Sequence, residues 1–379
     1  MRSLDVKNFG PIGDVNVRFE DLTILVGAQA SGKSVFLQLL KLLVDKDNIL
    51  TTLDRYNYVW SKNPVSILEL FFGEGMSKVW RQDSEFVFDG QLKVLDSLLG
   101  APENIPESLF YVPAQRILSI SDGRPKNFME FDLSTPYVLR AFSEILRLFF
   151  QNGMSGNTVF PMRKALDSTL QKSFNDSIFH DGKIVMDERT GQKKMRMEIG
   201  GMNVPFMTWS AGQKEFMPLL MAFYCLSDFS PTLLKREEYK YVVIEEPEMG
   251  LHPQAIKSVI LQVLELMNMG YKVIVSTHSP VFLEFAWAFN ILKNGDIAHK
   301  YEALCEMFDM TKDSEGVFKG IFDKNIGTVY FSREKGQVVS KDITSLDAAS
   351  EDDAIAEWGG LSQFSGKVTD IVSRYLNVM

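Results

Sequence analysis

The alternation of apolar and polar stretches predicts strands and helices in turn along much of the chain. Residues 4–27 contain two or three short apolar-rich runs broken by Gly-Pro turns. The last run, "LTILVG" (22–27), has the apolar character of a strand buried on both faces. A helix is predicted from Ser34, because apolar residues then recur at helical spacing. These residues are Val35, Phe36, Leu39, Leu40, Leu42 and Leu43.

The second half of the chain continues this alternation. We predict a helix over about 212–226, an apolar strand that ends at Ile244, a helix over about 253–269 and a strand over 271–276. Strands that alternate with helices are typical of a mostly parallel sheet with helices on both faces. The predicted fold class is therefore α/β.

The middle of the chain is predicted to form a small inserted unit. Amphipathic helices over 136–153 and 161–174 indicate a helical or lid subdomain at about 90–182. The alternating segment 183–201 is predicted to be a hairpin with its turn at Thr190-Gly191.

The last part of the chain, about 296–379, is predicted to be a C-terminal extension of a single domain that spans 1–379. It is expected to contain a hairpin and a terminal amphipathic helix. We expect the apolar face of this helix to pack against its own domain, with a partner protein as the alternative. The residues of this face are Leu361, Phe364, Val368, Ile371, Val372, Tyr375 and Leu376.

Composition limits the classes of partner. A net charge of −9 and a pI near 5.2 argue against a surface built for nucleic acid, although the basic cluster at 189–196 leaves a weak contact open. Cys225 and Cys305 lie among apolar residues and are predicted to be buried, reduced thiols of a cytoplasmic protein. No run approaches about eighteen apolar residues, and the first residues lack a signal-peptide core, so no membrane partner is expected.

The segment "GAQASGKS" matches the phosphate-binding pattern G-x-x-x-x-G-K-[ST] and lies between an apolar strand and a helix. Its backbone N–H groups would surround phosphate oxygens, Lys33 would carry charge to the β- and γ-phosphates, and Ser34 would offer its hydroxyl to Mg²⁺. Such a match arises by chance in on the order of one per cent of chains this long. The predicted nucleotide-binding residues are Gly27, Ala28, Gln29, Ala30, Ser31, Gly32, Lys33 and Ser34.

In the segment "VVIEEPEMGLHP" (242–253), a predicted apolar strand ends at two adjacent carboxylates. Ligands of parallel sheets bind beyond the carboxyl ends of the strands, so Glu245 and Glu246 are expected beside the phosphate loop. Glu245 would then orient Mg²⁺ through water, and Glu246 would polarise the attacking water as general base. A strand that merely ends in solvated acids is the structural alternative.

Two further segments add weaker signals. "WSAGQKEF" places Ser210, Ala211, Gly212 and Gln213 at a predicted helix start, where free N–H groups could bind a phosphate or simply form a cap. "VIVSTHSP" ends a strand at His278, and a single histidine in that position is usually structural.

In this order, the motifs resemble those of ATP-binding-cassette (ABC) ATPases. The start "L-x-V-x-N-F-G-P-I" and the pair "EEPEMGLHP" and "STHSP" are more narrowly similar to the soluble SMC/RecF/OLD-like group. The resemblance implies that Ser210–Gln213 is the signature motif and that His278 is the catalytic switch histidine. It also implies that "YVPAQR" (111–116) is the Q-loop, with Gln115 near Mg²⁺ and the lytic water.

Some positions depart from the group's pattern. Gln29 and Ala30 stand where Asn and Gly are common, Ala211 replaces a glycine, and Glu245 replaces the commoner Asp. "GLHP" (250–253) occupies the place of the "SALD" turn of transporter cassettes, which argues against a transporter subunit.

Two large additions found in relatives are not predicted. About ninety residues separate Gln115 from Ser210, which leaves no room for a long coiled coil. In the roughly one hundred residues after His278, the acidic stretch 347–353 is interpreted as a solvated loop, so no nuclease metal site is expected.

The resemblance implies an ATP- and Mg²⁺-dependent switch that dimerises head to head. Our leading hypothesis is the ATPase or sensor subunit of a bacterial anti-phage defence or DNA-maintenance system, working with a separately encoded effector. A slow or non-hydrolysing, nucleotide-gated scaffold that holds a toxin partner is the first alternative, and a transporter ATPase is the second.

Overall fold

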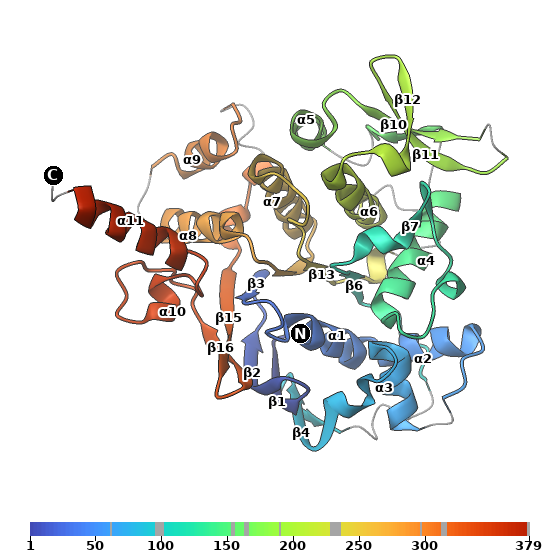
Figure 1. Cartoon of the computed structure of the whole chain (residues 1–379), viewed down its shortest axis with the longest axis horizontal. Helices are drawn as coiled ribbons and strands as arrows, with labels where there is room; N and C mark the ends of the chain where they lie inside the picture. The colour runs from blue at the N-terminus through green and yellow to red at the C-terminus, as the bar shows by residue number, and fades with distance from the viewer. Residues whose placement is uncertain are drawn as a thin grey trace.

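The structure is a computed structural model that describes residues 1–60, 63–94, 102–152, 156–162, 167–188, 191–227, 236–295, 298–311 and 317–376. Within these residues a ten-stranded sheet runs through the centre, in the order β5-β4-β1-β2-β16-β15-β3-β14-β13-β6 (Figure 1). In that order the strands are Gln91–Lys93, Trp80–Phe88, Ser3–Phe9, Ile12–Arg18, Gln337–Asp342, Ile326–Glu334, Leu22–Gly27, Lys272–Ser276, Tyr241–Glu245 and Leu109–Val112.

The sheet has a parallel half and an antiparallel half. β15, β3, β14, β13 and β6 run parallel to one another, which confirms the predicted α/β sheet around the sequence motifs. β1 pairs antiparallel with β2 and with β4, β4 with β5, and β15 with β16, whereas β16 pairs parallel with β2. Short turns join β1 to β2, β4 to β5 and β15 to β16, as antiparallel neighbours allow.

Helices cover both faces of the sheet. α1 (Lys33–Val44), α2 (Lys46–Arg55) and α3 (Pro64–Phe72) pack on one face, and α6 (Ala211–Leu226), α7 (Pro253–Asn268) and α8 (Pro280–Asn294) lie on the other (Figure 1). Alternate residues of each strand enter different cores: in β13, Val243 joins the α1 side, whereas Val242 and Ile244 join the α7 side. The same alternation turns Glu245 towards α1.

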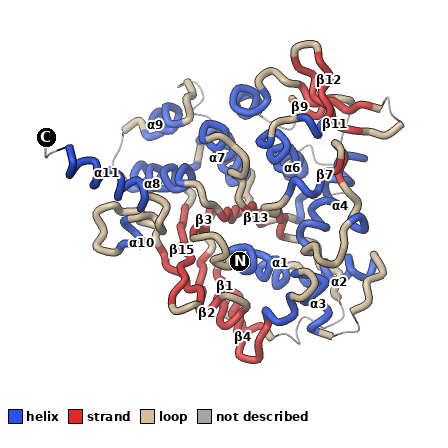
Figure 2. Tube along the Cα trace, in the orientation of Figure 1, coloured by secondary structure: helices blue, strands red, loops and turns tan. Residues whose placement is uncertain are grey.

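A second sheet stands apart from the first beside α6 (Figure 2). It has the order β12-β11-β10-β9, with strands Met202–Pro205, Lys194–Ile199, Lys183–Asp187 and Thr158–Phe160. β10 and β11 confirm the predicted hairpin, although Thr190 of its turn lies outside the described residues.

The chain between the two sheets contains the short hairpin of β7 (Ile120–Ser121) and β8 (Arg124–Pro125) and then α4 (Tyr137–Asn152). α5 (Ser168–Phe174) comes between β9 and β10 of the second sheet. α4 matches the predicted helix. Of the predicted helix 161–174, Ser168–Phe174 is helical and 161–162 is not, and residues 163–166 lie outside the described part. β6, which falls within the predicted lid range, belongs to the main sheet.

The remaining elements are short or terminal. They are α9 (Lys300–Met307), α10 (Asp353–Ala356), α11 (Gln363–Leu376), the 3-10 turns Met76–Val79, Arg116–Ser119, Phe128–Glu130, Phe206–Thr208, Arg236–Glu238 and Ile321–Asp323, and the π-helical turn Asn175–Phe179. Cys225 and Cys305 are both buried, as predicted. In the described part, no helix has the length and apolar character needed to cross a membrane.

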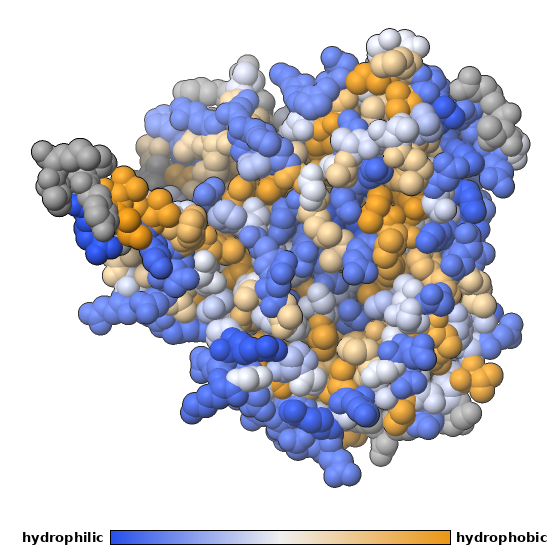
Figure 3. All heavy atoms as spheres, viewed as in Figure 1, coloured by the Kyte–Doolittle hydropathy of each residue, from blue (hydrophilic) through white to orange (hydrophobic). Residues whose placement is uncertain are grey.

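The C-terminal segment differs from its prediction in two ways. Its hairpin, β15 and β16, is part of the main sheet rather than an appendage. The expected packing of the terminal helix is wrong: in α11, Phe364 is 77% exposed, Val368 41% and Val372 49%. The helix leaves the body after Leu361, and hydrophobic atoms gather openly over it (Figure 3).

Candidate functional site

Four neighbouring parallel strands end at one edge of the main sheet, and each delivers one of the predicted motifs. β3 leads into the phosphate loop, β14 into His278, β13 into Glu245 and Glu246, and β6 into Gln115. Because parallel strands present their carboxyl ends together, residues more than 200 positions apart meet at this edge.

Two glycines of the phosphate loop are required by its geometry. Gly27 has a φ of +152°, and a Cβ atom there would lie 2.4 Å from the carbonyl oxygen of Phe331 on β15. Gly32, directly before α1, has a φ of +79°. Side chains at these positions would close the loop or strain it, so the first and last glycines of the motif shape the phosphate cradle.

Lys33 lies across the loop. Its Nζ atom donates hydrogen bonds to the carbonyl oxygens of Gly27 (2.9 Å) and Ala28 (3.1 Å) and to Oγ of Ser31 (3.1 Å). Burial lowers the pKa of Lys33 to about 8, and the nearby carboxylates of Glu246, Glu248 and Glu245 oppose this shift. Phosphate oxygens would replace the loop carbonyls as acceptors.

Glu245 is a buried carboxylate with an unused oxygen. Its side chain is 2% exposed, and Oε1 accepts a 2.6 Å hydrogen bond from the hydroxyl of Tyr111. Burial raises the pKa of Glu245, and hydrogen bonding by Ser34 and Tyr111 opposes that rise. Oε2 is buried and has no partner among the described residues. A buried, unpartnered carboxylate oxygen beside the Ser34 hydroxyl fits the oxygen ligands that Mg²⁺ prefers.

A cavity of about 170 Å³ borders Glu245. Ser34, Gln38, Gln115 and Glu245 contribute polar groups to its lining. Oε1 of Gln38 is also buried without a described partner. Gln38 was not predicted from the sequence, although its place four residues after Ser34 puts it on the same face of α1.

Glu246 and His278 face each other. Nε2 of His278 lies 3.5 Å from Oε1 of Glu246, and both side chains are a little under one-third exposed. The hydrogen bond from His278 is the largest cause of a lowered pKa of Glu246, which keeps this carboxylate ionised. Glu246 has a φ of +42°, a strained value for a residue other than glycine, so its placement is held by the surrounding contacts.

The predicted signature residues lie at the start of α6. Ser210 caps α6: its Oγ accepts from the N–H of Gln213 (3.2 Å), and Oε1 of Gln213 accepts from the N–H of Ser210 (3.1 Å). The Gln213 amide also donates to the carbonyl of Ile178 (3.1 Å), and a Cβ atom on Gly212 would lie 2.8 Å from the carbonyl oxygen of Gly250. Ser210 and Ala211 are exposed, so the turn faces solvent.

Three basic residues in the described part of the hairpin lie beside acidic residues. Lys193 lies 3.3 Å from Glu188, and Arg196 lies 3.5 Å from Asp187. Lys194 forms an ion pair with Asp122. These pairs weaken the case for a nucleic-acid contact at this surface.

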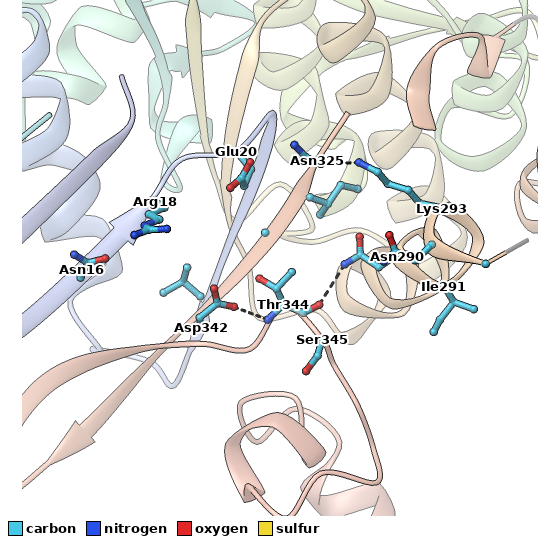
Figure 4. Close-up of a pocket in the computed structure, with 15 residues that line it drawn as sticks. Asn16, Arg18, Glu20, Asn290, Ile291, Lys293, Asn325, Asp342, Thr344 and Ser345 are labelled. Atoms are coloured by element: carbon cyan, nitrogen blue, oxygen red, sulfur yellow. Dashed lines mark hydrogen bonds between the residues drawn. The ribbon is translucent and has the colours of Figure 1, made fainter. Parts of the chain in front are cut away.

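A larger cavity, of about 990 Å³, lies away from the phosphate loop (Figure 4). Arg18, Asn290, Asp342 and Thr344 point towards it, and the amide of Asn290 donates to the carbonyl of Thr344. Ile326, which also lines it, is the first residue of β15, so the cavity opens at the amino end of this parallel strand. Ligands of parallel sheets bind beyond the carboxyl ends of the strands, so this cavity lies at the opposite edge from the one where a nucleotide is expected.

Comparison with protein families identifies ATPase domains in two segments. A family model described as "AAA ATPase domain" matches residues 1–95, and one described as "AAA domain, putative AbiEii toxin, Type IV TA system" matches residues 121–284. The Old nuclease of Escherichia phage P2 is 24% identical over an alignment 378 residues long, which includes 79% of this chain and 61% of that protein. The chain thus spans about three fifths of the length of this curated relative.

Solved structures of SMC heads were also matched. The SMC head domain from Thermotoga maritima has a TM-score of 0.40 at 11% identity, with 90% of this chain and 98% of that chain covered. The SMC head bound to the C-terminal winged-helix domain of ScpA has a TM-score of 0.42 at 13% identity, with coverages of 90% and 96%.

Proposed function

We propose that this chain, an ABC-type ATPase of the SMC/RecF/OLD-like group, binds ATP with Mg²⁺ and hydrolyses the bond between the β- and γ-phosphates, which yields ADP and phosphate. One observation carries this proposal: Lys33, Glu245 and the Glu246–His278 pair meet where neighbouring parallel strands end. This is the set of charges that phosphate binding, cation binding and water activation require.

Each residue has a separate role in the proposed reaction. Lys33 and the loop N–H groups hold the phosphates, and Ser34 and Glu245 would hold Mg²⁺, with Gln38 and Gln115 beside them. Bound Mg²⁺ would offset the negative charge of the phosphates. Glu246 accepts the proton of the attacking water, and His278 keeps the carboxylate ionised and oriented.

Phosphate release from ATP, measured with the purified protein, tests this assignment. Lys33→Ala is expected to abolish ATP binding, whereas Glu246→Gln is expected to bind ATP and lose at least about 99% of turnover. Lys7→Ala and Glu74→Gln are matched controls at exposed positions and are expected to behave like the wild type. If Glu246→Gln releases phosphate from ATP as fast as the wild type does, Glu246 is not the general base.

We also propose that two chains associate head to head, so that the signature turn of one reaches the phosphate loop of the other. The exposure of Ser210 and Ala211 supports this arrangement, since a turn that meets a nucleotide on a second chain must be open in the single chain. Size measurement of Glu246→Gln with and without ATP tests it. Association that depends on ATP supports the proposal, and a monomer under both conditions contradicts it.

In the cell, the proposed role is the ATPase or sensor subunit of an anti-phage defence or DNA-maintenance system with a separate effector. The support is the toxin–antitoxin description of one matching family and the similarity to a phage nuclease. Affinity capture of Glu246→Gln from the native host, with Lys33→Ala as control, tests it. A partner captured only by the ATP-trapped variant supports a switch.

A nucleotide-gated scaffold that holds a toxin is the second candidate, favoured by the same family description. The two candidates differ in whether hydrolysis is needed. If Glu246→Gln protects host cells as well as the wild type does, binding alone is sufficient and the scaffold is the better description.

A further inference from the structure

Arg116, next to the predicted Q-loop glutamine, has a fully buried guanidinium group that bonds only to main-chain carbonyls among the described residues. Nε donates to the carbonyl of Glu215 (3.1 Å). Nη1 donates to the carbonyls of Glu245 (3.1 Å) and Glu246 (3.2 Å), and Nη2 donates to that of Pro247 (3.3 Å). One side chain therefore joins the segment after β6, the first turns of α6 and the acidic turn after β13.

A buried charge needs compensation, and here acidic side chains supply it. Burial lowers the pKa of Arg116, while the carboxylates of Glu215, Glu248, Glu246 and Glu245 favour its charged form. The planar guanidinium can reach three chain segments at once because its N–H groups point in fixed, different directions. A lysine ammonium is a single point and could reach fewer of these carbonyls.

The contacts bear directly on the strained residue of the site. The N–H of Glu246 donates to the carbonyl of Ser276 (2.8 Å), and its carbonyl accepts from Arg116. These two bonds hold the peptide groups on either side of a residue with positive φ. The start of α6 also touches this turn directly, since Gly212 packs against Gly250.

We propose that Arg116 is a positioning residue. It couples the position of helix α6, which carries the signature turn, to the orientation of the Glu246 carboxylate. The inference rests on the proposed ATPase function and adds a route of regulation to it. When the signature turn at Ser210 engages a nucleotide, any displacement of α6 reaches Glu246 through the Glu215 carbonyl and the guanidinium. The Q-loop shares the link, because Gln115 precedes Arg116.

Arg116→Lys and Arg116→Gln test this link, and Arg140→Lys is a matched control. Arg140 is also fully buried and donates to a main-chain carbonyl, that of Leu70, but outside the site. Arg116→Lys is expected to bind ATP within about threefold of the wild-type affinity and to turn it over at least about thirtyfold more slowly. Equal losses in Arg116→Lys and Arg140→Lys would reduce Arg116 to a general packing role and overturn the inference.

A double-variant comparison separates positioning from stability. If Arg116 acts through Glu246, adding Arg116→Lys to Glu246→Gln causes no further fall in the residual turnover. A further fall of about thirtyfold in the double variant would mean that the two residues act independently, which contradicts the proposal.

Hydrogen exchange supplies a readout that does not depend on hydrolysis. In folded Arg116→Lys or Arg116→Gln, peptides over 211–217 and 243–252 should both exchange at least about tenfold faster, whereas Arg140→Lys leaves them unchanged. Unchanged exchange in either segment overturns the link. If the wild-type protein shows no ATP turnover, the proposed ATPase function is wrong. The hydrogen-exchange measurement still tests the link between α6, Arg116 and Glu246 in that case.

Discussion

The carboxylate of Glu248 accepts a 2.6 Å hydrogen bond from the main-chain N–H of His278. The same oxygen accepts a 2.8 Å hydrogen bond from the hydroxyl of Thr277. The turn after β13 therefore holds the turn after β14, and this contact sets the direction from which His278 approaches Glu246. Glu248 therefore positions the histidine through Oε1, while its Oε2 is buried without a partner among the described residues.

Glu248→Gln should weaken this contact without removing it, because the amide oxygen can still accept while the charge is lost. We expect a loss of about 1 kcal/mol in the free energy of unfolding and about a tenfold fall in turnover, with ATP affinity unchanged. Thermal or denaturant unfolding and steady-state phosphate release measure the two effects. A fall in turnover as large as that of Glu246→Gln would instead make Glu248 the base.

The pH dependence of turnover should report the contact between His278 and Glu246. The hydrogen bond from His278 lowers the pKa of Glu246, so the ionised base persists to a pH below the usual glutamate range. Its contribution to stability is likewise present above the unfolded pKa and is lost as pH falls through the lower folded pKa. In His278→Ala, the acid limb of single-turnover hydrolysis should move to higher pH. An unmoved limb would place the base outside this pair.

ATP affinity should fall as pH rises through the pKa of Lys33. Burial lowers that pKa to about 8 in the free protein, and phosphates at Nζ would raise it again. Binding should therefore take up protons above about pH 8 and weaken by up to about tenfold per pH unit. Calorimetry in buffers of different ionisation enthalpy measures the uptake. A constant affinity and no proton uptake between pH 7 and 9.5 would contradict the placement of phosphate at Lys33.

Mixing two inactive chains should restore activity if the signature turn acts across a dimer. Ser210→Arg blocks the turn and Lys33→Ala empties the loop, so each chain alone should be inactive. In a mixed dimer, one site combines the intact Lys33 of one chain with the intact Ser210 of the other. Recovery of phosphate release on mixing supports the shared site.

No activity at any ratio would mean either that each chain completes its own site or that both sites must act together. Doping with wild-type protein separates these outcomes. A concerted dimer is inhibited by either variant, whereas a self-contained chain is inhibited by neither.

The strands and loops that carry the catalytic groups were accessible from sequence because their signals are local. The apolar runs before Gly27, Glu245 and His278, together with the rule for parallel sheets, were sufficient to bring these residues to one edge. Gln38 carried a weaker local signal through its spacing from Ser34.

Tyr111 and Arg116 could not be assigned their contacts in this way. Tyr111 bonds a carboxylate 134 residues away, and Arg116 bonds carbonyls 99 to 131 residues away. Nothing in the neighbouring sequence distinguishes such partners from others. The C-terminal segment was misread for the same reason, since the pairing of Ile326 with Leu22 leaves no mark in either local pattern.

The pairing of β3 with β15, which lies beside the phosphate loop, has a consequence for synthesis of the protein. Gly27 pairs with Phe331 of β15, about 300 residues further along the chain. A nascent chain on the ribosome therefore carries the whole phosphate-binding sequence early but lacks the strand beside it until most of translation is complete. A message cut short before β15 yields a polypeptide with Lys33 and without a formed cradle, so aborted products should not compete for ATP.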